Sequence, residues 1–89
     1  MTPEDLLDRV HDRASFLAFV AALAAERGQA DGLERAAPDP YRLNGELGWN
    51  NADVPSFLGA AARGFERRPD EPPSWRLFAE FLYLGKIYE

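Results

Sequence analysis

The chain has 89 residues, a formal net charge of −5 at pH 7 and no cysteine. Its length suits a single domain, residues 1–89, with a small core, and its 46% hydrophobic content is typical of a soluble globular protein. The lack of cysteine excludes disulfides and thiolate chemistry, and the acidic charge argues against nucleic-acid binding, which needs clustered Lys and Arg. Because no apolar run approaches the roughly twenty residues that cross a bilayer, we expect no membrane contact.

The N-terminus carries the signals of a short first helix, which we predict at about 3–10. Thr2 can cap this helix, and Pro3 is tolerated in its first turn. Glu4 and Asp5 complement the positive end of the helix dipole. The same acidic start lacks the basic residues and apolar stretch of a secretory signal, so we expect a cytoplasmic protein.

A second helix is predicted at about 13–27, with Asp12 as its cap and Gly28 as its stop. One face carries large apolar side chains and is expected in the core: Phe16, Leu17, Phe19, Val20 and Leu23, with Ala24. The opposite face carries the alanines Ala18, Ala21, Ala22 and Ala25. Either these alanines reflect high helix propensity alone, or they let another helix approach closely, within the chain or across a dimer.

The segment 28–50 is predicted to form one long irregular connection, because prolines and glycines interrupt any helical period there. Within it, Asn44-Gly45 stands between alternating apolar residues and leaves open a short β-hairpin. Placing Tyr41 and Trp49 on one face of that hairpin would need a three-residue loop.

A third helix is predicted at about 52–67, capped by Asn51 or Asp53. Its expected core face consists of Val54, Phe57, Leu58, Ala61 and Phe65. Gly59 and Gly64 inside it each cost about 1 kcal/mol relative to alanine, so either the helix is marginal or a neighbour packs close to it.

The fourth helix is predicted at about 75–87, with Ser74 as its cap. Its large apolar residues span about half of its circumference, more than a peripheral helix needs. They are Trp75, Leu77, Phe78, Phe81, Leu82, Leu84 and Tyr88. This helix should therefore contact at least two others, with Trp75 in the core, or keep part of its face for a partner.

Few residues could support catalysis. His11 is the only histidine and lies beside Asp8 and Asp12, which is more typical of a solvated or capping residue than of a general base. With one histidine and no cysteine we predict no metal site. No glycine-rich phosphate loop, dinucleotide fingerprint or calcium loop is present, so we predict no cofactor and no catalytic residue.

Aromatic and cationic residues are the best candidates for a partner-binding surface, because Trp, Tyr and Arg anchor interfaces when they are exposed. The candidates are Tyr41, Arg42, Trp49, Tyr83, Lys86 and Tyr88. In so small a domain, however, we favour a core or lid position for Trp49.

The C-terminal residues resemble the closing W-x-x-F-A-x-x-L-Y-x-x-K-x-Y-E pattern of a family of small acidic bacterial proteins of unknown function. The matching residues are Trp75, Phe78, Ala79, Leu82, Tyr83, Lys86, Tyr88 and Glu89, with support from Phe16, Phe19, Trp49, Asn51, Phe57 and Leu58. The long connection and Gly85, where alanine is expected, depart from the pattern. The family carries no assigned activity, so the resemblance implies a helical fold and transfers no catalytic residue.

These patterns together predict an all-α domain of four helices with the last at its centre. We predict a cytoplasmic, non-enzymatic protein-binding module of immunity or antitoxin type, whose acidic surface suits a basic protein or toxin. The first alternative is a structural or homo-oligomeric subunit that associates through the alanine face or the last helix. The second is an enzyme, which would require His11 to lie buried in a cleft with carboxylates.

Overall fold

The computed structural model describes residues 1–38 and 45–89. Within these ranges the chain forms four α-helices and no strand, which confirms the predicted all-α fold. The elements are α1 (Pro3–Leu7), α2 (Arg13–Ala36), the 3-10 turn η1 (Glu46–Gly48), α3 (Val54–Glu66) and α4 (Trp75–Ile87).

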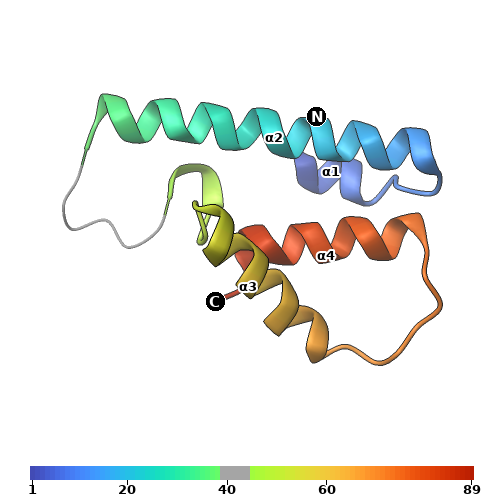
Figure 1. Ribbon diagram of the computed structural model, residues 1–89. Helices are drawn as coiled ribbons and strands as arrows, with labels where there is room; N and C mark the ends of the chain where they lie inside the picture. The colour runs from blue at the N-terminus through green and yellow to red at the C-terminus, as the bar shows by residue number, and fades with distance from the viewer. Residues whose placement is uncertain (39–44) are drawn as a thin grey trace.

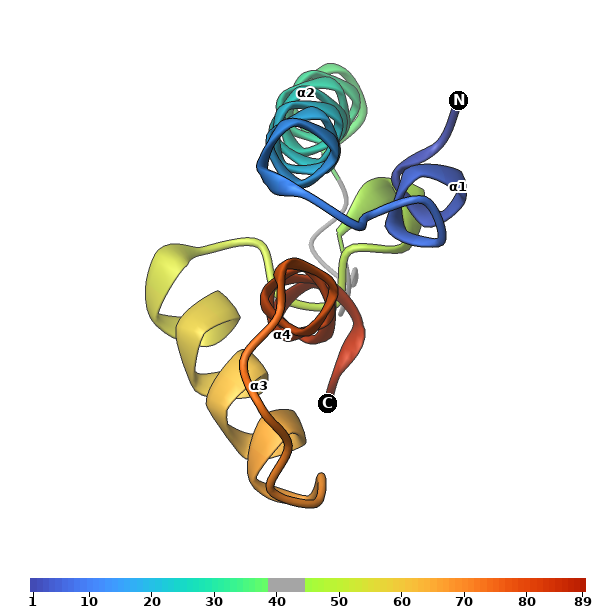
Figure 2. The same cartoon turned by 90° about the vertical axis from the view of Figure 1, so that its right-hand side faces the viewer.

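The helix α4 lies at the centre of the molecule. Figure 1 shows α2 and α4 running alongside each other, with α1 beside the first half of α2. Seen from the end, α1 and α2 lie on one side of α4, and α3 lies on the other (Figure 2). Both α2 and α3 pack on α4, with few contacts between α2 and α3.

The four helix starts follow from local sequence. Side chains of the predicted cap residues accept hydrogen bonds from the third residue of each helix: Thr2 from Asp5, Asp12 from Ser15, Asp53 from Ser56, and Ser74 from Leu77. These bonds satisfy amide groups that have no partner inside the helix. Of the two alternatives for α3, Asp53 is the cap.

The end of α2 was predicted wrongly, because the helix continues through Gly28 to Ala36. A glycine weakens a helix by only about 1 kcal/mol, which contacts elsewhere can offset. Here Ala30 is fully buried. Glu34 accepts hydrogen bonds from the Arg27 side chain at 2.6 Å and from the Glu46 amide at 3.0 Å. Contacts with η1 therefore hold the extra turns. At the other end of the chain, α1 is shorter than predicted and stops at Leu7.

The irregular connection is correspondingly shorter than predicted. The first arm and the Asn44 turn residue of the possible hairpin lie outside the described residues. The segment that would form its second arm is the 3-10 turn η1 instead. Leu47 and Gly48 adopt positive φ values of 57° and 82°, which reverse the chain before Trp49. Trp49 enters the core with only 3% of its surface exposed.

The core is built from small and medium residues around one fully buried phenylalanine, Phe19. The other buried members of the main cluster are Leu7, Val10, Leu23, Ala30, Trp49 and Ala79. Two residues predicted for the core lie largely outside it, because Trp75 is 38% exposed and Leu17 is 52% exposed. The Trp75 ring packs only at the edge of the molecule, 5.4 Å from the Phe16 ring and 5.9 Å from the Phe78 ring.

The buried face of α3 is also rotated from the predicted one. Ala60, Ala61 and Gly64 are buried, whereas Val54 is 69% exposed and Leu58 is 53% exposed. Small residues occupy the positions that face α4, because the two helices lie so close together that larger side chains would not fit there. The large side chains are left at the edge of the contact.

Glycines on both helices allow this close approach. A Cβ atom on Gly64 would lie 3.1 Å from Cγ of Tyr88, and one on Gly85 would lie 2.7 Å from Cζ of Phe57. Of the two readings of the α3 glycines, close packing therefore applies at Gly64. It also explains why alanine is absent at Gly85.

Candidate functional site

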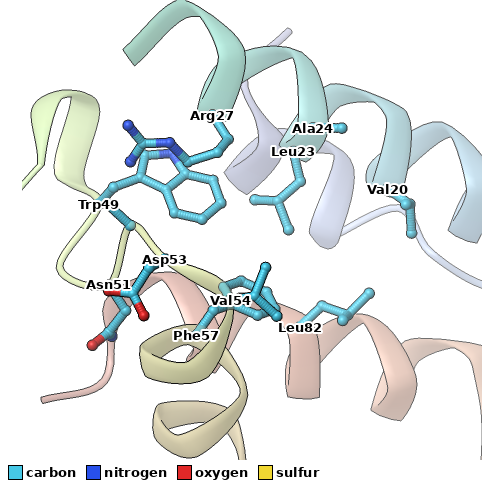
Figure 3. Close-up of a pocket in the computed structure, with 11 residues that line it drawn as sticks. Val20, Leu23, Ala24, Arg27, Trp49, Asn51, Asp53, Val54, Phe57 and Leu82 are labelled. Atoms are coloured by element: carbon cyan, nitrogen blue, oxygen red, sulfur yellow. The ribbon is translucent and has the colours of Figure 1, made fainter. Parts of the chain in front are cut away.

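An apolar hollow of about 260 Å³ opens between α2 and the start of α3. Figure 3 shows Leu23 of α2 directed toward Phe57 of α3, with Leu82 of α4 beside it and Trp49 at one end. The complete lining is Val20, Leu23, Ala24, Arg27, Trp49, Asn51, Ala52, Asp53, Val54, Phe57 and Leu82. Most of this surface is aliphatic or aromatic, as is usual for binding sites.

A second apolar hollow, of about 480 Å³, shares Leu82 with the first. It lies toward the start of α4 and the end of α3. Its lining is Phe16, Phe65, Glu71, Pro73, Leu77, Phe78, Phe81 and Leu82. We call the two adjoining hollows together the apolar groove; it is lined by residues of α2, α3 and α4 and of the segments that precede α3 and α4.

Large apolar side chains stand exposed along this groove. Val54 and Phe78, 69% and 44% exposed, belong to its lining. Leu17 lies three residues before Val20 and Leu58 four residues after Val54, so each is one helical turn from a lining residue on the same side of its helix. The Trp75 ring lies 5.4 Å from the lining ring of Phe16. Contiguous exposed apolar surface of this kind marks interaction sites in soluble proteins, whereas isolated exposed residues are ordinary. The groove is therefore the strongest candidate site on the described part of the chain.

Charge is sparse in the groove. Among its described lining residues only Arg27, Asp53 and Glu71 are charged. Arg27 is neutralised by Glu34, with 2.6 Å between Nη2 and Oε2. The pKa of Asp53 lies below its usual value, because the Ser56 amide and hydroxyl both donate hydrogen bonds to its carboxylate. Asp53 is therefore ionised at neutral pH.

A cluster of charged side chains is centred on Lys86, next to Trp49 of the groove lining. This side chain is only 3% exposed. Its Nζ donates to Glu26 Oε1 at 2.5 Å and to Glu4 Oε1 at 2.8 Å. One ammonium group thus joins α1, α2 and α4.

Trp49 completes this cluster. Its indole Nε1 donates to the same Glu26 oxygen at 3.0 Å. The Lys86 ammonium lies 5.8 Å from the centre of the indole, and the Arg27 guanidinium lies 5.3 Å from it. Both distances fall within the range of cation–π attraction. Trp49 is therefore held by two cations and one carboxylate, and its ring closes the end of the groove.

The ion pairs decide the protonation states in the cluster. Burial alone would lower the pKa of Lys86, but the hydrogen bonds and charges of Glu26 and Glu4 raise it above its ordinary 10.5. Burial alone would raise the pKa of Glu4, but the Lys86 hydrogen bond leads the effects that lower it below 4.5. Lys86 and Glu4 are thus both charged at neutral pH, and the cluster acts as an electrostatic tie between helices.

The candidate residues from the sequence occupy different places. Tyr41 and Arg42 lie outside the described residues. Trp49 and Lys86 come together, but in the buried cluster, so neither is presented to a partner as an exposed anchor.

The two remaining tyrosines are half-buried. Tyr83 packs against the core, where burial leads the causes that raise the pKa of its hydroxyl. The Tyr88 hydroxyl accepts a hydrogen bond of 3.3 Å from Nη1 of Arg67. Neither tyrosine is among the residues that line the groove.

Sequence reasoning missed the exposed groove residues because it assigned Leu17, Val54, Leu58 and Phe78 to core-facing positions. One feature of the sequence did indicate which face of α3 is buried. The small residues Ala60, Ala61 and Gly64 recur at helical spacing in α3 and marked its true packing face.

His11 does not occupy a cleft. Its side chain is 76% exposed, and its ring nitrogens contact only the Arg9 carbonyl and the Asp12 carboxylate. The described residues contain no group of three acidic, His or Cys side chains placed to hold a metal ion. None of the described helices has the length and apolar character needed to cross a membrane.

Comparison with known proteins assigns no relative. No family model, curated protein or solved structure matches the chain. The groove is therefore the feature from which a function can be inferred.

Proposed function

We propose that the protein is a cytoplasmic, non-enzymatic binding module of immunity or antitoxin type, whose apolar groove receives a helical segment of a partner protein. The observation that carries this proposal is the groove itself, a long apolar depression bordered by large exposed side chains. Helices that bind in grooves use this arrangement, with apolar anchors on one face of the incoming helix.

The energetic argument rests on the exposed edge of the groove. Full burial of a Leu or Val side chain contributes roughly 1.5–3 kcal/mol, so completing the burial of two half-exposed residues adds about 2–3 kcal/mol. Val54 and Leu58 are both more than half exposed and are neighbours along one side of α3. A partner that covers this edge gains that burial, whereas folding of the chain alone leaves it unused.

The partner is best sought among the products of adjacent genes, because toxins and their immunity proteins are commonly encoded together. We expect one such product to bind the wild-type chain in calorimetry. Leu58→Glu should weaken binding at least tenfold, since it places a charge on the apolar edge. Ala18→Glu, on the exposed opposite side of α2, is the matched control and should bind normally. Equal binding by both variants would exclude the groove as the site.

A second candidate function is a homo-oligomeric subunit. It is favoured by the alanine face of α2, where Ala18, Ala21 and Ala25 are exposed in the chain. No described helix packs there, so if these alanines serve a close contact, it must come from another molecule. Light scattering over a dilution series separates the candidates. A dimer that Ala18→Glu dissociates and Leu58→Glu leaves intact would favour the oligomer.

A further inference from the structure

Resting on the proposed function, we infer that the occupant of the apolar groove is an amphipathic helix of a separate protein, with basic residues at both ends of its apolar stripe. The pattern of charge along the groove carries this inference. The lining is mostly apolar. The carboxylate of Asp53, which forms no ion pair with a described Lys or Arg, lies in the first hollow, and Glu71 in the second belongs to an ion network with a negative net charge.

At the first end the charge is Asp53. Its carboxylate accepts hydrogen bonds from the Ser56 amide at 2.8 Å and hydroxyl at 2.9 Å. No Lys or Arg of the described chain forms an ion pair with it. An incoming ammonium or guanidinium group could contact this carboxylate without displacing an existing partner.

At the second end the charge belongs to an ion network that includes Glu71. Arg68 contacts Glu71 at 3.3 Å and Glu80 at 2.6 Å. Arg76 contacts Glu80 at 3.1 Å and Asp8 at 3.4 Å. Three carboxylates and two guanidinium groups leave a net charge of −1 on this network.

The spacing of the two ends sets the length of the partner helix. Asp53 precedes α3 and Glu71 follows it, and α3 has 13 residues. At 1.5 Å per residue α3 is about 20 Å long, and Glu71 lies beyond its last residue, Glu66, so a partner helix that reaches both ends needs at least about four turns.

A second copy of the chain fits the groove less well. Each copy has a net charge of −5, so apposed grooves would bring like charges together at both ends. The exposed alanine face lies on the side of α2 away from Val20 and Leu23. Its insertion into the groove of another copy would be a heterologous contact, which builds open chains unless its rotation closes a ring.

The test uses the full chain and three synthetic helical peptides of about 18 residues with the same leucine stripe. One carries Lys at both ends of the stripe, one Glu, and one Gln. Binding is followed by fluorescence anisotropy of a labelled peptide at low and moderate salt. We expect the Lys peptide to bind at least tenfold more tightly than the Glu peptide, and this preference to shrink as salt rises.

Matched variants locate the effect. Asp53→Asn removes the charge while it retains a good helix cap. Glu71→Gln removes the charge at the other end, where no helix cap is involved. Each should weaken the Lys peptide severalfold and leave the Gln peptide unchanged. The control is Asp12→Asn, because Asp12 caps α2 in the same way and lines neither hollow.

Other outcomes would overturn the inference. If the Lys and Glu peptides bind the wild-type chain equally and neither binds Leu58→Glu, the basic partner is refuted, but the groove is supported as a binding site. Self-association that Leu58→Glu abolishes would identify a second copy as the occupant. Failure of all three peptides up to millimolar concentration would refute the amphipathic helix, and the partner measurement above would then decide the proposed function separately.

Discussion

Lys86 brings distant parts of the sequence together through one charged atom. Its Nζ reaches Glu4, 82 residues earlier in the chain, and Glu26, 60 residues earlier. A buried ammonium group is costly unless it is paired and hydrogen-bonded, and here both carboxylates meet that need. Removing Lys86 leaves the mostly buried Glu26 without its cation, whereas Glu4 is 43% exposed and can be hydrated.

We therefore expect Lys86→Met to destabilise the fold by about 3 kcal/mol, the usual result of breaking a buried ion pair. Methionine keeps the apolar stem but leaves Glu26, 16% exposed, without its cation. Urea unfolding measures the loss. The double variant Lys86→Met/Glu26→Gln should recover part of it, because glutamine needs no counter-charge and still accepts the Trp49 hydrogen bond. A double variant no more stable than the single one would show that lost packing is the cause.

The same cluster makes stability depend on pH at both extremes. The lowered pKa of Glu4 adds stability above pH 4.5, which is lost as pH falls through its folded pKa. The raised pKa of Lys86 adds stability below pH 10.5, which is lost as pH rises through its folded pKa. Thermal unfolding between pH 3 and 12 should show losses on both sides of a plateau.

In Lys86→Met both losses should be smaller, although other groups still contribute. The pKa values of Asp5, Asp12 and Asp53 are also lowered, chiefly by hydrogen bonds at helix caps, and the pKa of Tyr83 is raised mainly by burial. An unchanged pH profile in this variant would contradict the assignment to Lys86 and Glu4.

At the scale of elements, the glycines of α2 and α4 have opposite roles. A Cβ atom on Gly28 would meet nothing within 4 Å, whereas one on Gly85 would lie 2.7 Å from the Phe57 ring. The glycine in α2 is only a weak helix former in open space. The glycine in α4 is the surface against which α3 packs.

Substitution by alanine should change the stability of the protein in opposite directions at these two glycines. Gly28→Ala should stabilise the protein by about 0.5–1 kcal/mol through helix propensity and the entropy of the unfolded chain. Gly85→Ala should destabilise it by about 2 kcal/mol, because overpacking a tight contact outweighs the same propensity gain. Chemical denaturation of both variants checks this pair. Stabilisation by Gly85→Ala would mean that α3 and α4 are less closely packed than the structure shows.

For the whole molecule, the apolar residues divide into those that hold the fold and those left for a partner. Phe19 is fully buried, whereas Leu58 is 53% exposed at the groove. Phe19→Ala should cost about 4 kcal/mol and Leu58→Glu less than about 1 kcal/mol. Circular dichroism during thermal unfolding measures both. A large loss in Leu58→Glu would place the groove edge in the core and remove the groove as a free surface.

Much of the fold could be predicted from the sequence, because much of it is local. The hydroxyl and carboxylate caps Thr2, Asp12, Asp53 and Ser74 each act within three residues, and apolar periodicity gave the helices that follow them. The end of α2 was missed because contacts with η1, more than ten residues away, outweigh the local cost of Gly28. The candidate site was missed for a similar reason, since a helical wheel shows a wide apolar face but not which part of it a neighbour covers.

By itself the sequence determined the helical class, the helix starts, the acidic charge and the lack of cysteine chemistry. The tertiary structure alone decided that Lys86 lies inside, that small residues of α3 face α4, and that Val54 and Leu58 are left exposed beside the groove. The physical reason is the distance along the chain over which each interaction acts. Caps and periodicity act over one or two turns, whereas burial depends on how closely helices distant in the chain approach each other.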